Sequence, residues 1–483
     1  MDNVQNQCAQ KLIENCIETV KPMNKPDTFS SNLSRPFSLF SFLIYLISTT
    51  TVLGQYQNDF SNPKVRKIDS VVQHLYNNNQ FNGAILVKDK GKVIYKKALG
   101  WADLDKRDTL DLQTPMRVAS VSKQFTAMAI MILKEKGLLN YTDTINQYFP
   151  TFPYKGITIK HLLHHQSGLA DSFEELKGVT RMFGGKRLLN NDDIIAYFTA
   201  VRPKMEFKTG KKATYCNTNY ILLASIVEKV GKMPFDQFLD HHIFKPLKMN
   251  HTFLYHPKKN RTNFYRIIKQ DTAVVKLDTV QQDDDTQVIT STLQTKKVII
   301  TKKKKRALGY YIDHRYGWQL LDYHFYDGIV GEKSICTTVE DLAKWDNALH
   351  NRTLLSDAAQ REAFKMAKLT NKKEYGYGYG FKIYRKKPHI VFHHGLYRGF
   401  RSYLQHNTVD KTFITILTNR GLGRQMYPIY KTINKILYDQ KFKMPKKIWI
   451  EKKTLARFKQ RYWIDYTKRM PQLDATSFGS KEK

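Results

Sequence analysis

Residues 116–137 of this chain read Met116-Arg-Val-Ala-Ser120-Val-Ser-Lys123-Gln-Phe-Thr-Ala-Met-Ala-Ile-Met-Ile-Leu-Lys-Glu-Lys-Gly137. A short strand-like run gives way at Ser120 to a long apolar helix, which we expect to end near Gly137 because glycine is a natural helix C-cap. The Ser120 hydroxyl then lies at the positive end of the helix dipole, where developing negative charge is stabilised. Lys123 follows three residues later and projects from the same face. A serine beside a lysine whose pKa is lowered by burial is a pair suited to acyl transfer.

The Ser-x-x-Lys pattern is weak by itself, because Ser61–Lys64 and Ser480–Lys483 also match it in stretches typical of solvated loops. A second candidate is Tyr215-Cys216-Asn217, which follows a turn and precedes a buried helix predicted over Ile221–Val230. That setting presents a phenol and an amide from a loop. A tyrosine beside a lysinium loses its proton more easily, so Tyr215 is a candidate for moving a proton between nucleophile and leaving group.

A third candidate, His393-His394-Gly395, lies at the end of an apolar strand. A glycine at an exposed strand edge lets a substrate backbone approach closely. The N–H of Leu396, just after it, is positioned to pair with the Ser120 N–H as an oxyanion hole. His393 would present a donor near the leaving group or a carboxylate.

Strand signals gather at both ends of the chain, and helical signals lie between them. The pattern predicts a helix, then two strands, then a mostly helical middle part, then four strands and a closing helix. In chain order these are 65–78, 83–88, 93–99, 143–247, 377–384, 389–392, 401–405, 412–417 and 426–437. The sequence therefore predicts an α+β fold in which an antiparallel sheet built from both chain ends is flanked by helices and carries an inserted, mostly helical lobe.

In order and context, the three motifs resemble the signature of the serine β-lactamase-related hydrolases. That family includes class C β-lactamases, D,D-carboxypeptidases, D-aminopeptidases and esterases, and its signature is Ser-x-x-Lys, Tyr-x-Asn, then Lys-Thr-Gly or His-x-Gly. The resemblance covers about residues 60–440 and implies the β-lactamase/transpeptidase-like fold. Four further stretches are similar to family segments: Ile157–Leu169, Phe244–Thr252, Arg306–Tyr310 and Thr337–Trp345.

The resemblance implies a serine hydrolase that acts through an acyl-enzyme, without cofactor or metal. Ser120 would be the nucleophile, and Lys123 and Tyr215 would share the general acid and base work in an order that the sequence leaves open. The substrate would be a small molecule or peptide with an amide or ester carbonyl, such as a cell-wall D-amino-acid peptide or a β-lactam.

The remaining predicted site residues would bind the substrate or the oxyanion. Asn217 would orient Lys123 and the substrate amide, and His393 would take the cationic position of the third motif. Gly395 would give the substrate access to the strand, and the N–H groups of Ser120 and Leu396 would bind the oxyanion.

Two positions depart from the family pattern. Cys216 replaces a more usual serine, and the His-His-Gly motif lacks the hydroxyl that helps to hold the substrate carboxylate in β-lactamases. A histidine with an ordinary pKa of about 6.5 is only partly charged at neutral pH, so we expect simple esters or D-amino-acid amides to be better substrates than penicillins. The alternative is a catalytically silent envelope or polyanion-binding protein that keeps the fold; the intact motifs argue against it.

The chain is strongly basic, with 79 Lys and Arg against 43 Asp and Glu and a formal net charge of +36. This balance favours an anionic envelope or membrane surface as a partner, or else a diffuse coat of lysines. The stretch 441–470 interleaves aromatic and basic residues, which is typical of anionic surfaces but also of a solvated helix with lysine stems over apolar contacts. Only charge supports nucleic acid, so no specific nucleic-acid partner is expected.

Residues 37–53 form the only membrane-like segment of the sequence. Its short apolar core suits a signal peptide cleaved before Gln55 better than a retained anchor, and Met23 would be a more natural start for it. We therefore expect an exported, periplasmic or secreted protein, or one anchored by residues 37–53. The expected parts are an N-terminal extension at 1–54, a hydrolase domain at 55–440 with an insertion at 258–305, and a basic tail at 441–483.

Two histidine pairs, His164-His165 and His241-His242, are candidates for metal ligands. No carboxylate lies at a supporting spacing, so we expect neither pair to hold a metal. His165 is interpreted as a structural loop residue, and Thr338–Asp341 as a helix capping box in which Thr338 is the cap.

Overall fold

The computed structural model describes residues 57–445, except for 185–186, 258–263, 272–281, 284–285, 288–296, 305, 314–316 and 422–425. The segment 37–53 and nearly all of the tail 441–483 lie outside the described residues, so the expectations about them stay predictions. Among the helices of the described ranges, none combines the length and apolar character needed to cross a bilayer.

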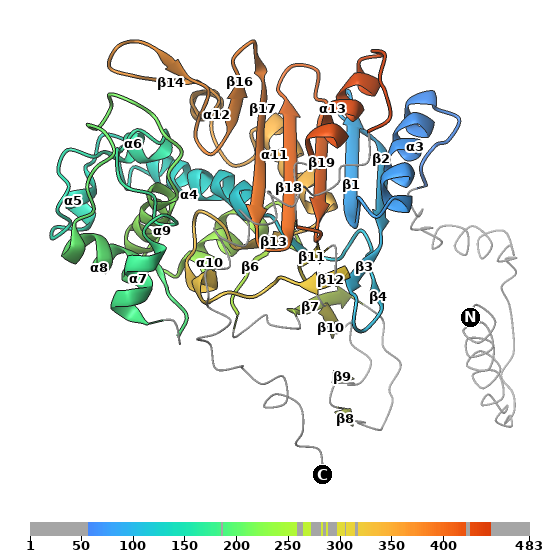
Figure 1. The fold of residues 1–483 in the computed structure, drawn as a ribbon, viewed down its shortest axis with the longest axis horizontal. Helices are drawn as coiled ribbons and strands as arrows, with labels where there is room; N and C mark the ends of the chain where they lie inside the picture. The colour runs from blue at the N-terminus through green and yellow to red at the C-terminus, as the bar shows by residue number, and fades with distance from the viewer. Residues whose placement is uncertain are drawn as a thin grey trace, which may run out of the picture. The chain divides into compact units, whose positions relative to one another are not determined.

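A six-stranded antiparallel sheet, ordered β16-β17-β18-β19-β1-β2, forms the centre of the fold (Figure 1). Strand β1 from the N-terminal part pairs with β19 from the C-terminal part, with Ile85 opposite Ile416. The predicted sheet from both chain ends is thereby confirmed. The strands are β1 (Gly83–Asp89), β2 (Lys92–Leu99), β16 (Lys382–Tyr384), β17 (Lys387–Tyr397), β18 (Phe400–Asn407) and β19 (Phe413–Thr418).

Two terminal helices, α3 (Pro63–Asn77) and α13 (Met426–Leu437), cover one face of this sheet (Figure 1). Helix α3 begins where Asn62 accepts a hydrogen bond from the Lys64 N–H and where a proline starts the first turn. Its apolar residues recur at helical spacing and are buried against β1, β19 and α13. These residues are Val65, Ile68, Val71, Val72 and Leu75.

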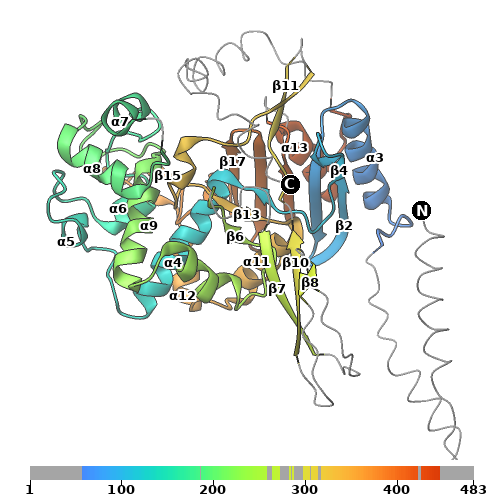
Figure 2. The ribbon, with the colours of Figure 1, turned by 90° about the horizontal axis from the view of Figure 1, so that it is seen from below.

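The other face of the sheet meets α11 (Val339–Asn351) and the inserted helical lobe, which lies to the left of the sheet in Figure 1. Helix α4 (Lys123–Glu135) is buried from Lys123 through Leu133, as expected for a helix packed on all sides (Figure 2). The rest of the lobe consists of α5 (Ile145–Tyr148), α6 (Ile159–Leu163), α7 (Leu176–Phe183), α8 (Asn191–Val201), α9 (Asn217–Gly231), α10 (Phe235–Leu239) and η2 (Asp240–Phe244).

The structure differs from the expected strand at 377–384. Only Lys382–Tyr384 joins the sheet as β16. Gly380 has φ +79°, and a Cβ there would overlap the backbone at the start of α4. Because Gly380 has a left-handed conformation, the chain turns there, and the strand that joins the sheet begins only at Lys382.

The expected insertion at 258–305 contains a long antiparallel pair, β7 (Phe264–Asp271) with β10 (Lys297–Lys304). Whether it is an addition to the domain stays a prediction. The smaller elements are β3 (Trp101–Asp103), β4 (Asp108–Thr109), β5 (Met116–Arg117), η1 (Ala119–Ser122), β6 (Phe253–Leu254), β8 (Gln282–Asp283), β9 (Thr286–Gln287), β11 (Tyr310–Asp313), β12 (Gly317–Leu320), η3 (Phe325–Gly328), β13 (Ile335–Thr337), α12 (Asp357–Ala363), β14 (Ala367–Lys368) and β15 (Glu374–Tyr375).

Candidate active site

Ser120 lies in the short turn η1 that joins β5 to α4. The Val118 N–H donates to the Ile335 carbonyl at 2.9 Å, which fixes the chain before the turn to β13. Ala119 then has φ +48°, a left-handed conformation that residues with a Cβ seldom adopt. This turn presents the Ser120 side chain at the N-terminal end of α4, as the sequence predicts.

A cavity of about 330 Å³ opens beside Ser120. Three other predicted site residues, Tyr215, Asn217 and Leu396, line it as well. The structure therefore brings together residues that lie far apart in the sequence. The full lining is Ala119, Ser120, Asp171, Phe173, Glu174, Leu176, Glu206, Thr214, Tyr215, Asn217, Glu332, Lys333, Leu396 and Tyr397.

Lys123 is completely buried behind Ser120. Its Nζ lies 3.3 Å from the Ser120 Oγ and also donates to the Asn217 Oδ1 at 2.9 Å and the Glu332 carbonyl at 2.8 Å. Burial lowers the pKa of Lys123 from 10.5 to about 7, although nearby carboxylates oppose this shift. A substantial fraction of the amine is therefore neutral at neutral pH and able to accept a proton.

Asn217 is held by a carboxylate that the sequence analysis did not identify. Its backbone N–H and its side-chain amide donate to the Asp171 carboxylate, at 2.9 and 3.0 Å. Because an amide has one donor end and one acceptor end, these bonds leave the Asn217 oxygen facing Lys123. Asp171 comes two residues after the stretch 157–169 that resembles a family segment. This position was the only feature of the sequence that could have indicated a role for Asp171 at the site.

Tyr215 differs from its expected behaviour. Lys123 Nζ lies 4.9 Å from the centroid of its ring. Burial nevertheless raises the pKa of Tyr215 well above 10, with the nearby Ser120 hydroxyl acting in the opposite direction. The expectation that a lysinium would ease loss of its proton is therefore wrong, because desolvation dominates. Tyr215 is a protonated donor at neutral pH, and Lys123 is the better base.

His393 is fully buried, and both of its ring nitrogens have partners. Nδ1–H donates to the His394 carbonyl at 2.9 Å, so Nε2 accepts from the Tyr377 hydroxyl at 3.2 Å. Burial lowers the pKa of His393 well below 6.5. The imidazole is therefore neutral. His393 does not supply the positive charge expected at this position of the third motif, because burial disfavours its charged form.

Gly395 and Leu396 bring β17 close to Ser120. A Cβ on Gly395 would overlap the Val118 carbonyl oxygen and lie 3.0 Å from the Ala119 Cβ, so the backbone before Ser120 needs a glycine there. Tyr397 and Phe400 close a two-residue turn, which places Leu396 at the next register position, opposite Arg401. In an antiparallel ladder that position is not hydrogen-bonded, so the Leu396 N–H points away from β18. It is thus free to act with the Ser120 N–H.

Acidic residues form one wall of the cavity. Asp171, Glu174 and Glu206 all line it. Burial, followed by the charges of Glu174 and Asp171, raises the pKa of Glu206. This wall therefore favours neutral or cationic groups over anionic ones.

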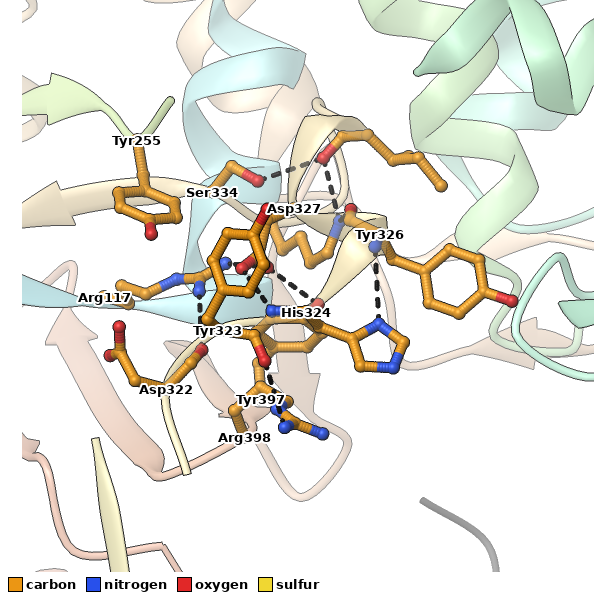
Figure 3. Close-up of polar contacts among 12 residues, drawn as sticks. Arg117, Tyr255, Asp322, Tyr323, His324, Tyr326, Asp327, Ser334, Tyr397 and Arg398 are labelled. Atoms are coloured by element: carbon orange, nitrogen blue, oxygen red, sulfur yellow. Dashed lines mark hydrogen bonds and ion pairs between the residues drawn. The ribbon is translucent and has the colours of Figure 1, made fainter. Parts of the chain in front are cut away.

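Tyr397, which lines the cavity, belongs to a buried polar network (Figure 3). Arg117, on the strand before Ser120, forms an ion pair of 2.8 Å with Asp327, and the Tyr397 hydroxyl donates to the same carboxylate at 2.9 Å. Although burial opposes it, Arg117 holds the pKa of Asp327 below its ordinary value. Lys333 donates to the carbonyls of Tyr326 and Ile329, at 2.9 and 2.8 Å. The network ties β5, η3 and the end of β17 into one unit.

Of the histidines considered for a metal, His164 and His165 form hydrogen bonds within the fold. The His164 Nδ1 bonds the Tyr377 carbonyl at 3.2 Å, and the His165 Nδ1 accepts from the Cys216 N–H at 3.2 Å. No group of three or more potential metal ligands occurs among the residues that the structure describes. The Thr338 side chain accepts from the Asp341 N–H at the start of α11, so its predicted role as a helix cap is confirmed.

The chain is similar in sequence and in fold to known proteins. Residues 68–430 match the family model described as "Beta-lactamase". Penicillin-binding protein 4* of Bacillus subtilis (strain 168) is 28% identical over 390 residues, which cover 80% of this chain and 78% of that protein. The octameric penicillin-binding protein homologue from Pyrococcus abyssi has a similar fold, with a TM-score of 0.61, 23% identity and 78% coverage of both chains. The D-amino acid amidase from Ochrobactrum anthropi SV3, complexed with L-phenylalanine amide, has a TM-score of 0.56 and 19% identity, over 78% of this chain and 96% of that chain.

Proposed function

The chain belongs to the β-lactamase family, typically serine hydrolases, and from this premise we propose that it cleaves an amide or ester through an acyl-enzyme on Ser120. The observation that carries the proposal is the buried Lys123 amine, 3.3 Å from the Ser120 hydroxyl and with its pKa lowered to about 7. Such an amine is a base matched to neutral pH, and it lies within reach of the nucleophile.

In the first half of the proposed reaction, neutral Lys123 takes the proton from the Ser120 Oγ as that oxygen attacks the carbonyl carbon. The N–H groups of Ser120 and Leu396 stabilise the oxyanion. Tyr215 then gives its proton to the departing nitrogen or oxygen and regains one from Lys123. In the second half, water attacks the acyl carbonyl and gives a proton to Lys123. The same pair returns a proton to the Ser120 Oγ as the acyl–oxygen bond breaks, which releases the acid and restores Ser120.

The named relatives support a peptide or amide substrate. A penicillin-binding protein is among the relatives named above, and a D-amino acid amidase shares the fold. We propose a D-amino-acid amide, peptide or related ester whose acyl group faces the acidic wall. The acidic wall suits an acyl group that carries an amine. The alternative, a silent polyanion-binding protein, does not account for an aligned Ser120, Lys123 and Asn217.

The rate should depend on pH through Lys123. Its neutral form is the active one, so kcat/KM should rise with pH through an apparent pKa of about 7 and fall about tenfold for each pH unit below it. The measurement is a pH–rate profile between pH 5 and 9 with a neutral ester.

Two variants make this profile diagnostic. Tyr215→Phe should lower the rate, but kcat/KM should still rise with pH through about 7. Lys123→Met should remove nearly all activity. A native profile that is flat from pH 5.5 to 8.5 would show that Lys123 is not the base.

We also propose that the protein is exported, on the basis of the apolar segment 37–53. The mature chain should then begin at or near Gln55, since cleavage follows the small residues before it. N-terminal sequencing of native protein from its source tests this. Recovery of residues 1–50 would favour a retained anchor.

A further inference from the structure

The third motif of this chain, His393-His394-Gly395, lacks a positively charged side chain. His393 is neutral and is enclosed by its bonds to Tyr377 and to the His394 carbonyl. A substrate anion along β17 would therefore find no positive charge on the motif itself. The next strand supplies one.

Lys382, on β16, places its ammonium beside the motif. Its Nζ lies 3.0 Å from the His394 Nε2 and 5.4 Å from the centroid of the Tyr215 ring. An ammonium has donors only, so His394 must accept through an unprotonated Nε2. Partial desolvation of its ring and the nearby Lys382 ammonium both lower the pKa of His394, which keeps that nitrogen free of a proton although the side chain is partly exposed. A neutral histidine thus positions the lysine.

The Lys382 ammonium has no acidic partner. Within the described ranges, no carboxylate forms an ion pair with it, and its pKa is lowered from 10.5 by burial alone. The other two lysines at the site are already engaged. Lys123 bonds Ser120, Asn217 and Glu332, and Lys333 pairs with the Glu332 carboxylate at 2.8 Å. A partly buried cation without an anion is stabilised when an anion arrives.

The open edge of β17 runs from the cavity toward the Lys382 ammonium. Side chains at alternate positions of a strand share a face, so the exposed side chains of His394 and Leu396 lie on the same face of β17. Leu396 lines the cavity. The pairing of β16 with β17 stops at Lys382 opposite Phe392, so β17 from His393 onward has no partner on that side within the described residues. A substrate that fills the cavity and extends along this edge reaches Lys382.

We propose that Lys382, held by His394, binds a carboxylate on the substrate and so replaces the cation missing from the third motif. This inference rests on the proposed function and makes it narrower: the substrate carries a carboxylate at the end remote from the acidic wall. It also reverses the expectation from sequence that carboxylate-bearing substrates are disfavoured, because that expectation considered only the charge of His393.

Two matched substrates test the proposal: an N-acyl-D-alanyl thioglycolate, whose leaving group ends in a carboxylate, and its methyl ester. Lys382→Gln should lower kcat/KM for the carboxylate substrate about ten- to a hundredfold, mainly through KM, since one charge-assisted contact is lost. The methyl ester should change less than about twofold. Lys382→Arg should retain most of the preference for the carboxylate.

Lys387→Gln is the matched control, because Lys387 is an exposed residue of the adjacent strand and the change in net charge is the same. It should leave both substrates unaffected. If Lys382→Gln affects the two substrates equally, or neither, the carboxylate subsite is refuted while the hydrolase remains. If the native protein hydrolyses neither substrate and a fluorophosphonate leaves Ser120 unlabelled, the proposed function fails and this inference fails with it.

Discussion

Ser120→Ala should lower the hydrolysis of every ester and amide substrate by at least about a thousandfold and abolish covalent labelling. No acyl-enzyme can form without the Oγ. The fold should remain, because the Ser120 side chain is only half-buried and the described contacts of its hydroxyl are with the side chains of Lys123 and Tyr215 alone. The free energy of unfolding should change by about 1 kcal/mol or less. Turnover of a p-nitrophenyl ester and urea denaturation of the same sample measure both quantities.

Ser122→Ala is the matched control, two residues away. Ser122 is buried, and its Oγ accepts from the Ile335 N–H at 3.1 Å, so it stabilises the junction of the turn with β13. Removing it should cost about 1–2 kcal/mol of unfolding free energy and leave kcat nearly unchanged. If instead Ser122→Ala eliminated activity and Ser120→Ala did not, the assignment of the nucleophile would be wrong.

Asp327→Asn should lower the free energy of unfolding by about 3–5 kcal/mol, the usual cost of stranding a buried charge. Arg117 and Asp327 are 1% and 0% exposed, so Arg117 would lose its counterion with no water to replace it. Tyr397 would lose its charged acceptor in the same step. Urea denaturation, with the slope compared between variants, measures the effect.

Asp240→Asn provides the comparison, since Asp240 pairs with Lys245 at 2.6 Å on the surface, where the two side chains are 46% and 69% exposed. Solvent screening limits such a pair to about 1 kcal/mol or less. Equal losses for the two aspartates would mean that the network in Figure 3 does not carry the stability assigned to it.

The sequence predicts the sheet and the central helix because their signals are local. Strands β1 and β19 are short, mostly apolar runs that are buried on both faces, and α4 is a longer run that is buried around its whole circumference, so the length of each run distinguishes strand from helix. The pairing of the first strand with the last one follows from the distribution of strands along the chain. The motif residues Ser120, Tyr215 and Leu396 also reach one cavity as expected.

The protonation states of the site residues cannot be predicted from the sequence around each residue. The neutral state of His393 depends on burial and on Tyr377, a residue of another segment that bonds its ring. The protonated state of Tyr215 is set by desolvation, which outweighs the neighbouring amine. Both quantities depend on packing that only the assembled fold defines.

Lys382 and Asp171 were missed for a related reason. Lys382 reaches the site because Gly380 ends the preceding loop and β16 then pairs with β17. Asp171 acts through Asn217, which lies on a different element. No spacing along the chain relates Lys382 to His394, and the only signal for Asp171 is its place two residues after the stretch 157–169 that resembles a family segment.

The most direct test of the acyl-enzyme mechanism is the intact mass of the native protein after exposure to a fluorophosphonate, followed by peptide mapping of the adduct. The account predicts one adduct per chain, on Ser120, formed faster as the pH rises through about 7 because neutral Lys123 activates the hydroxyl. The Ser120→Ala protein should remain unlabelled. An unmodified native protein, or an adduct on another residue such as Ser122 or Tyr215, would contradict the account.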